Sequence, residues 1–454
     1  MTTQLSEQDT AFGVDDALAV AKIEPEVLKA RFAEMHSSEL AELLLACRDD
    51  KQRRLLIACI PDDMLGDTLL ELPEGMQEDL LADFKVQQIG DVVEHLDSDD
   101  ATDLLQAVDK EVADEVIDSL EPDDRREIEP LMAHDEETAG GLMQVELFKV
   151  RDDWQVEKVM EVLRRWSKDI DNLNYVYVVD AEDRLVSVLS LHRLLFIEPD
   201  VCIADVADAS FPRVVSDQDQ EEVTKVFEKY NVLALPVVDD QGVLIGRITA
   251  DDVIDVIQEE ATEDMYRLAA LSEQDDMAEP VRKTAWRRGV WLAVNLVTAI
   301  LASVVIAQFE ATISHIVALA VLMPIVASMG GIAGTQTLTV IVRGIALGRV
   351  TYANAKRALM KETSVGLFTG LTFALVIGAV VSFWFPQWGI DLGLVIAAAM
   401  MINLCVAGLA GALIPLTLQR LHIDPALASG TILTTVTDVV GFLSFLGLAT
   451  IFLL

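Results

Sequence analysis

Cysteine and histidine are scarce in this sequence of 454 residues. The four cysteines, Cys47, Cys59, Cys202 and Cys405, are scattered and form no CxxC pair, so neither a disulfide framework nor a zinc-finger site is indicated. The six histidines form no HExxH pair, which argues against an intramembrane metalloprotease, and no Walker phosphate loop is present. We therefore expect a chain that is not an enzyme and lies in a reducing compartment.

Basic side chains are also few, with 34 Lys and Arg against 75 Asp and Glu. The imbalance is confined to residues 1–280, which hold 70 of the acidic groups and 24 of the basic ones. Residues 281–454 carry 5 acidic and 10 basic groups and are mostly apolar. Such an acidic surface repels phosphate backbones, so a nucleic-acid partner is excluded, and an acidic soluble region followed by a membrane region is predicted.

Long apolar runs dominate the second region. Each is longer than the roughly 20 residues that cross a bilayer core, and the five runs are residues 289–309, 311–342, 363–390, 392–419 and 425–454. Basic residues lie before the first run, between the second and third, and between the fourth and fifth. Because such residues stay on the cytosolic side, the N-terminus is predicted inside and the C-terminus outside.

Asp438 is an acidic residue near the middle of the last apolar run. A carboxylate at that depth costs about 2.5 to 3.5 kcal/mol on insertion scales, and it normally faces an aqueous path or a partner. No Lys or Arg lies within the runs to pair with it. The residue therefore indicates a cation site, the alternative being an Asp kept protonated by neighbouring threonines.

Glycine is dense in the second run, at Gly330, Gly331 and Gly334. Small residues within a span permit close helix packing, whereas an irregular backbone there can line a cavity. The sequence leaves both interpretations open.

An apolar residue recurs every twelve positions in the acidic region. The series comprises Ile60, Leu72, Phe84, Leu96, Val108, Leu120 and Met132. Several members are followed by residues that begin helices. The pattern predicts short helices stacked into a solenoid-like domain.

A second repeat has an offset of 59 residues. The segment 177–190 matches 236–249, and each copy reads as two strands joined by a polar turn with helices on either side. This resembles a tandem pair of CBS domains. In that family a Ser or Thr followed three residues later by Asp contacts a nucleotide ribose, and Thr249 and Asp252 match this pattern. The first copy has Ser190 followed by Arg193 and departs from it.

Acidic residues cluster between the second copy and the membrane. Asp252, Asp255 and Glu259 are spaced three and four apart, as are Glu260, Glu263 and Asp264, so each set follows one helical face. Like charges at that spacing destabilise a helix unless cations screen them. The linker is thus a natural place to sense cytosolic cations.

The order of these parts resembles the MgtE family of bacterial magnesium channels over residues 30–454. The resemblance implies a multidomain membrane protein with an all-α superhelical N-terminal domain, α+β tandem CBS domains and a five-helix transmembrane domain. It also implies a homodimer in the bacterial inner membrane, with a pore between subunits and a plug helix that gates its cytosolic mouth. Asp438 would be the pore carboxylate, with Thr434 and Gly430 along the same path and Glu310 at the outer mouth. The family often has Asn where this chain has Ile332.

These expectations give a domain plan and a feedback hypothesis. The plan is a flexible segment (1–24), a helical domain (25–135), CBS 1 (136–199), CBS 2 (200–258), a connecting plug helix (259–284) and the membrane domain (285–454). At high cytosolic Mg²⁺, ions would bridge acids of the helical domain and linker and keep the pore closed. The candidate regulatory residues are Asp99, Asp103, Asp252, Asp255, Glu260, Glu263 and Asp264. ATP or another adenine nucleotide is a candidate ligand of CBS 2.

Two other functions fit the same composition. One is a nucleotide sensor that the spans merely anchor in the membrane, although an anchor would not need Asp438. The other is a carrier that couples the cation to a second solute, since channel and carrier differ in motion more than in composition.

Overall fold

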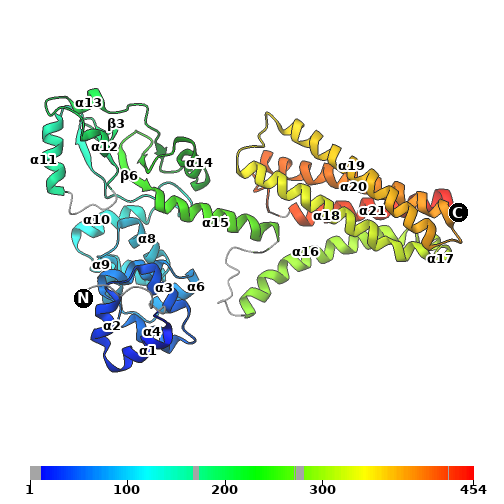
Figure 1. Cartoon of the computed structure of the whole chain (residues 1–454), viewed down its shortest axis with the longest axis horizontal. Helices are drawn as coiled ribbons and strands as arrows, with labels where there is room; N and C mark the ends of the chain where they lie inside the picture. Colours follow the sequence, from blue (N-terminus) through cyan, green and yellow to red (C-terminus); the bar gives the residue numbers. More distant parts are fainter. Residues whose placement is uncertain (1–11, 167–172, 270, 272–280, 428) are drawn as a thin grey trace, which may run out of the picture. The chain divides into compact units, whose positions relative to one another are not determined.

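A computed structural model describes residues 12–166, 173–269, 271, 281–427 and 429–454. The chain divides into two compact units, residues 1–260 and 261–454. Helix α15 begins in the first unit and ends in the second (Figure 1).

Short helices build the N-terminal part of the first unit. They are α1 (Val14–Ile23), α2 (Pro25–Phe32), α3 (Ser37–Leu45), α4 (Asp50–Ile57), α5 (Asp62–Leu70), α6 (Glu74–Leu81), α7 (Val86–Val93), α8 (Ser98–Gln106), α9 (Lys110–Ser119) and α10 (Pro122–Leu131). Helix α3 packs on α5, α5 on α7 and α7 on α9, as in a superhelical stack. All seven residues of the twelve-residue series lie in or against one apolar core. The solenoid-like prediction is confirmed.

The predicted flexible segment 1–24 is wrong for its second half. Helix α1 occupies Val14–Ile23, and Ala17, Leu18 and Ala21 are buried in the core of the helical domain. Spacings of one and four residues place these three side chains on one helical stripe, which packs against α2 and α4. Residues 1–11 lie outside the described part.

Two three-stranded sheets of identical topology follow. The first contains β1 (Lys149–Arg151), β2 (Tyr175–Val179) and β3 (Leu185–Ser190), and the second contains β4 (Val214–Val215), β5 (Ala234–Val238) and β6 (Leu244–Thr249). In each sheet the first strand is parallel to the second and the second is antiparallel to the third. The pair Tyr175↔Ser190 in one sheet corresponds to Ala234↔Thr249 in the other, 59 residues later. The repeat read from the sequence is therefore a structural repeat.

Helices cover these sheets. They are α11 (Val156–Trp166), α12 (Leu191–Leu194), α13 (Ile203–Val206) and α14 (Gln220–Tyr230). A shared apolar cluster that includes Tyr177, Val188, Val238 and Leu244 joins the two repeats.

Helix α15 corrects the predicted plug helix at residues 259–284. It starts at Ala250, directly after β6, and runs without a break to Leu268. The acids of the linker do not interrupt it; Glu260 accepts a hydrogen bond from Gln220, and Glu263 forms an ion pair with Arg267. Residues 270 and 272–280 lie outside the described part, and the first long apolar helix begins at Val281 rather than residue 285.

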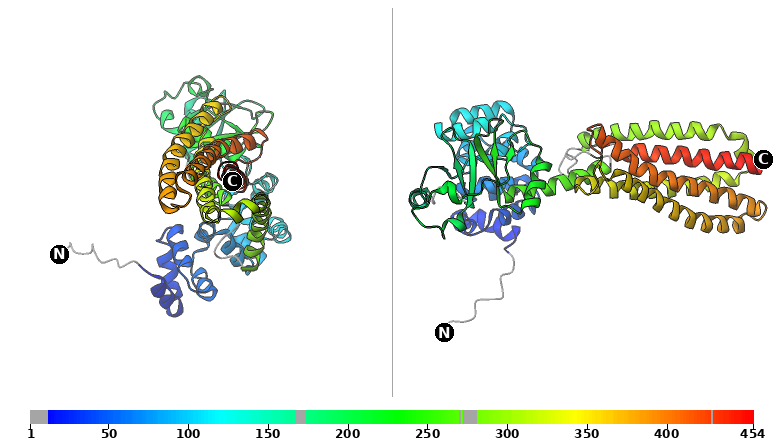
Figure 2. Two further views of the ribbon diagram at one scale, coloured as in Figure 1. Left: turned by 90° about the vertical axis from the view of Figure 1, so that its right-hand side faces the viewer. Right: turned by 90° about the horizontal axis from the view of Figure 1, so that it is seen from above.

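Among its described residues, the second unit contains five helices long and apolar enough to cross a membrane. They are α16 (Val281–Ala307), α18 (Ala318–Ala346), α19 (Ala355–Trp384), α20 (Gly389–Arg420) and α21 (Ser429–Leu453), with the short α17 (Glu310–His315) between the first two. The prediction of five spans is confirmed. Helices α18, α19, α20 and α21 lie side by side in Figure 1 and in the right-hand view of Figure 2, where α20 packs against the other three and α16 packs against α21.

Glycine allows this close packing. Helix α18 is continuous through residues 330–337, so the glycine-dense segment is a packed helix and not an irregular backbone. Gly334 lies against Leu433 of α21, and Gly366 of α19 against the backbone of Leu404 in α20. A side chain at either position would press on the neighbouring helix.

Candidate functional site

The first two turns of one helix and the first turn of another bring several acids together in the first unit. Asp99, Asp100 and Asp103 lie on α8, and Asp252 lies near the start of α15. Electrostatic repulsion from Asp252 reaches all three acids of α8. We call these four residues the acidic cluster. Asp99, Asp103 and Asp252 were predicted as regulatory residues, and the structure places them together.

Polar contacts that need no metal hold α8 in place. Gln144 Nε2 donates to Asp99 Oδ2 at 3.0 Å, and Gln144 Oε1 accepts from Arg247 Nε at 2.9 Å. Ser98 Oγ donates to Glu146 Oε2 at 2.7 Å. Asp99, Gln144 and Arg247 are all buried. The helical domain is thus docked on the CBS pair through buried hydrogen bonds, beside carboxylates that repel one another.

The pKa values of the cluster reflect this repulsion. Burial, and then Asp252, raise the pKa of Asp99 well above its ordinary value and that of Asp100 to about 7. Burial, and then Glu136 and Asp252, raise the pKa of Asp103 to about 7. Asp103 keeps contact with solvent, which weakens the effect there, so Asp100 is the stronger case. A cation among these groups relieves the repulsion.

Acids further along α15 face acids of the helical domain. Burial, and then Glu71, raise the pKa of Asp255, whereas burial, Asp255 and then Glu74 raise that of Glu259. Acids of α15 and acids at the end of α5 and the start of α6 therefore repel one another, although Asp255 and Glu259 are exposed to solvent. Sequence reasoning missed Asp100, Glu71 and Glu74 as members of this surface.

The remaining predicted regulatory residues are not part of the cluster. Glu260 accepts a hydrogen bond from Gln220 Nε2 of α14 at 2.6 Å. Glu263 forms an ion pair with Arg267, and Asp264 is half-buried beside it in the second unit. Within the described part of the chain, no three His, Cys, Asp or Glu side chains converge closely enough to hold a metal ion directly.

Arg267 connects the end of α15 to the loop before α21. Its Nη1 lies 2.5 Å from Asp424 Oδ2, while Asp424 Oδ1 accepts from the Ala426 backbone N–H at 2.8 Å. The next residue, Leu268, packs against a cluster that includes Leu338 and Leu433. This end of α15 is therefore seated on α18, α20 and α21 by one ion pair and one apolar contact.

The proposed ribose-binding pair has a structural role. Thr249 Oγ1 donates to Asp252 Oδ2 at 2.6 Å, and the Thr249 backbone N–H donates to the same oxygen at 3.1 Å. These bonds cap the start of α15. Asp252 belongs both to this cap and to the acidic cluster.

Asp438 lies half-buried on α21. Its side chain has no hydrogen bond or ion pair with any residue in the described ranges. The hydroxyls of Thr435 and Thr437 donate to the backbone carbonyls of Thr431 and Thr434, at 2.7 and 3.0 Å, and not to Asp438. The alternative of a protonated Asp held by threonines therefore lacks the contacts it requires.

The other predicted path residues lie along and around α21. Thr434 is one turn before Asp438, and its Oγ1 donates to the Gly430 carbonyl at 3.0 Å. Gly430 faces the carbonyl of Leu268, which would lie 3.5 Å from a Cβ at this position. Glu310 begins α17, which packs on α21, and is exposed. Ile332 is 55% exposed on α18.

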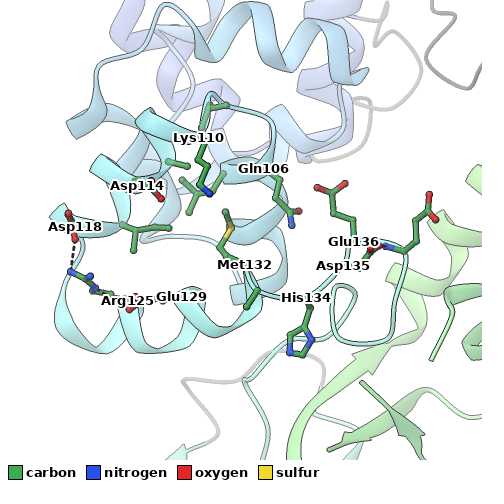
Figure 3. A pocket seen from close by; sticks show the side chains of 16 residues that line it. Gln106, Lys110, Asp114, Asp118, Arg125, Glu129, Met132, His134, Asp135 and Glu136 are labelled. Atoms are coloured by element: carbon green, nitrogen blue, oxygen red, sulfur yellow. Dashed lines mark hydrogen bonds and ion pairs between the residues drawn. The ribbon is translucent and has the colours of Figure 1, made fainter. Parts of the chain in front are cut away.

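A cavity of about 1030 Å³ lies elsewhere, between α8, α9 and α10 and the segment 132–137 (Figure 3). Its lining mixes signs of charge, since Lys110, Arg125 and His134 face several acids. Arg125 is already paired with Asp118 at 2.8 Å and Glu129 at 3.3 Å. None of the predicted site residues lines the cavity, and the mixed charge of its lining does not indicate a particular class of ligand.

The sequence was compared with known families and proteins. The divalent cation transporter domain of the MgtE family matches residues 323–448, the MgtE intracellular N domain matches 35–137, and CBS domains match 139–199 and 203–259. The magnesium transporter MgtE of Thermus thermophilus is 36% identical over 343 residues, 74% of each chain. The magnesium transporter MgtE of Bacillus subtilis is 33% identical over 337 residues, again 74% of each chain.

One solved structure resembles the first unit. It is the cytosolic domain of the Mg²⁺ channel MgtE in complex with ATP, which is 34% identical and has a TM-score of 0.50. The match covers 52% of this chain and 97% of that chain.

Docking of α8 should depend on pH in the absence of divalent cations. The docked state holds protons more tightly than the separated state, where an Asp has its ordinary pKa near 4. Docking is therefore most stable below about pH 4 and weakens as the pH rises through about 7. We expect hydrogen exchange at α8, corrected for the intrinsic rate, to increase between about pH 5 and pH 8 in EDTA.

Mg²⁺ added at the higher pH should restore the protection of α8. An Asp100→Asn/Asp103→Asn variant should show a flatter pH dependence. Equal protection of α8 at both pH values in the wild type would contradict the assignment.

Proposed function

The chain belongs to the MgtE family of divalent cation transporters, and from that premise we propose that it carries Mg²⁺ across a membrane under control of its acidic N-terminal region. The observation that carries the proposal is Asp438, a carboxylate without a partner among the described residues, in the middle of an apolar helix. A simple membrane anchor for a nucleotide sensor does not need such a residue. An enzymatic function is not proposed.

Mg²⁺ gives up its water reluctantly, so a few oxygen atoms that contact the hydrated ion suffice for a path. Asp438 supplies a charged oxygen, and Thr434 and Gly430 supply further polar atoms toward the Leu268 end of α21. Glu310 would attract cations at the opposite end. An inside-negative potential contributes about 2.3 kcal/mol per elementary charge per 100 mV, which drives entry of a divalent cation without nucleotide hydrolysis.

Control of the path rests on the acidic cluster. Without a cation, Asp99, Asp100, Asp103 and Asp252 repel one another and favour separation of α8 from α15. Mg²⁺ at the cluster favours the docked form, and a ligand shifts an equilibrium only by its difference in affinity between the two states. Because α15 is one continuous helix, a displacement of its first turn would be transmitted to its last turn, which carries Arg267 and Leu268.

Three further parts of the proposal concern assembly, location and nucleotide. A homodimer with Asp438 contributed by each subunit would place two carboxylates on one path. We place the chain in the bacterial inner membrane with the CBS pair in the cytosol and the C-terminus outside. The relative solved with ATP supports an adenine nucleotide at the CBS pair, with Thr249 and Asp252 as candidate contacts if the cap between them opens.

Asp438→Ala should abolish Mg²⁺ uptake into proteoliposomes that carry an inside-negative potential. The expected loss is about tenfold or more, because the path loses its charged oxygen. Asp391→Asn, at the start of α20, is the control and should retain uptake. Equal uptake by wild type and Asp438→Ala would remove Asp438 from the mechanism, and solute-dependent uptake would favour the coupled carrier.

Neutralising the acidic cluster should remove feedback. Asp100→Asn/Asp103→Asn/Asp252→Asn should keep transporting when the Mg²⁺ concentration on the N-terminal side is high, whereas wild-type uptake should fall about fivefold or more. The control variant Glu111→Gln/Asp114→Asn/Glu115→Gln changes the net charge equally on α9, away from the cluster. Normal closure of the cluster variant would count against this gate.

Breaking the Arg267–Asp424 ion pair should weaken the contact between the end of α15 and the loop before α21. Arg267→Gln and Asp424→Asn should each raise uptake at high Mg²⁺ on the N-terminal side by about threefold. The charge-reversed double variant Arg267→Asp/Asp424→Arg should recover part of the closure, because opposite charges again face each other across this contact, while Glu263, which also pairs with Arg267, is left beside an acid. Arg420→Gln, an exposed residue of the same loop region, is the control. Additive effects in the double variant would argue against a direct contact.

A further inference from the structure

Asn403 is a fully buried polar residue in the middle of α20, with 0% of its surface exposed. Its Nδ2 donates to the Val326 carbonyl of α18 at 2.9 Å. Its Oδ1 is buried and has no hydrogen-bond partner among the described residues. Leucine has nearly the same shape without an unsatisfied oxygen, so stability alone does not account for an asparagine in these apolar surroundings.

The carboxamide of Asn403 lies between glycines of two other helices. A Cβ at Gly330 of α18 would lie 2.2 Å from Asn403 Nδ2, and a Cβ at Gly441 of α21 would lie 2.8 Å from the same atom. Real Cβ atoms essentially never come that close to another heavy atom. Asn403 therefore fills the space between α18 and α21 that these two glycines leave open.

Gly441 is three residues after Asp438 on the same helix, a rise of about 4.5 Å. The contact between Asn403 and Gly441 is thus less than one helical turn from the proposed path carboxylate. Any change in size at this contact moves α21 where it carries Asp438. The hydrogen bond to the Val326 carbonyl fixes the carboxamide to α18. The contact between Asn403 and Gly441 therefore sets the position of α21 relative to α18.

We propose that Asn403 is a positioning residue for cation transport: it sets the separation of α21 from α18 and thereby the place of Asp438 in the path. The proposal rests on the transport function proposed above. Asn403 itself does not contact the cation. Its effect should appear as a change in apparent affinity and ion preference and not only in the amount of folded protein.

The test measures Mg²⁺ and Ni²⁺ uptake into proteoliposomes by the full chain, giving KM, maximal flux and the ratio of the two fluxes. Asn403→Leu keeps the size and removes the tether to Val326, and Gly441→Ala pushes the helices apart. Each should raise KM for Mg²⁺ or alter the Mg²⁺/Ni²⁺ ratio by about fivefold while a monodisperse protein is retained. Gly447→Ala, on the same helix with nothing within 4 Å of the added Cβ, should match the wild type.

Asn403→Ala/Gly441→Ala provides the decisive comparison. The Cβ added at Gly441 enters the space freed by the shortened Asn403 side chain, so the double variant should have a lower KM than Gly441→Ala and should match the single variant Asn403→Ala within about twofold, since both lack the tether to Val326. This result is expected even if Gly441→Ala alone fails to fold. Wild-type KM and ion ratio in Asn403→Leu, or a double variant worse than both single variants, would overturn the role of Asn403. Absence of Mg²⁺ uptake by the wild type would overturn the proposed transport function as well.

Discussion

Repulsion between buried carboxylates is the constraint on which the first unit depends. Asp99, Asp100 and Asp252 lie in a partly desolvated space where ionisation is unfavourable, as the raised pKa values record. Hydrogen bonds from Gln144 and the Ser98–Glu146 pair hold the helical domain against the CBS pair in spite of that repulsion. The docked arrangement thus combines fixed polar contacts with repulsion between carboxylates, which a bound cation would reduce.

Helix α15 connects the acidic cluster to the membrane region. Its first turn carries Asp252 and its last turn carries Arg267, with a continuous helical backbone between them. At the first end its partners are acids, and at the second end its partners are Asp424 and an apolar cluster around Leu268. One end therefore lies among acids, where we propose that cations act, and the other contacts the helices of the proposed path. The distribution of charge along this single helix is what makes feedback physically reasonable.

Packing in the membrane region follows from small residues. Glycines on α18, α19 and α21 let α20 approach closely, and Asn403 uses two of these positions to contact both α18 and α21. Glu362 of α19 is buried in the same region, with Thr337 Oγ1 3.4 Å from its Oε2. These buried polar groups lie where a specific separation of helices matters more than the gain from an apolar side chain.

Much of the architecture was predictable from the sequence because it depends on local patterns of residues. Apolar run length determined the five spans, a twelve-residue period determined the helical stack, and an offset of 59 residues determined the paired sheets. Asp438 was identified because a lone acid in an apolar run conflicts with its immediate neighbours.

Other features depended on the tertiary structure. Helix α1 was not predicted from the sequence, because its short apolar stripe is stabilised only by packing against α2 and α4. The regulatory acids were predicted as one group along the sequence, yet Glu260, Glu263 and Asp264 lie apart from the acidic cluster, which Asp100 joins. Gln144 and Arg247 are 103 residues apart in the chain, and Asn403 meets glycines from two other helices. Periodicity and hydropathy are properties of neighbouring residues, whereas these contacts exist only once the path of the whole chain brings distant side chains together.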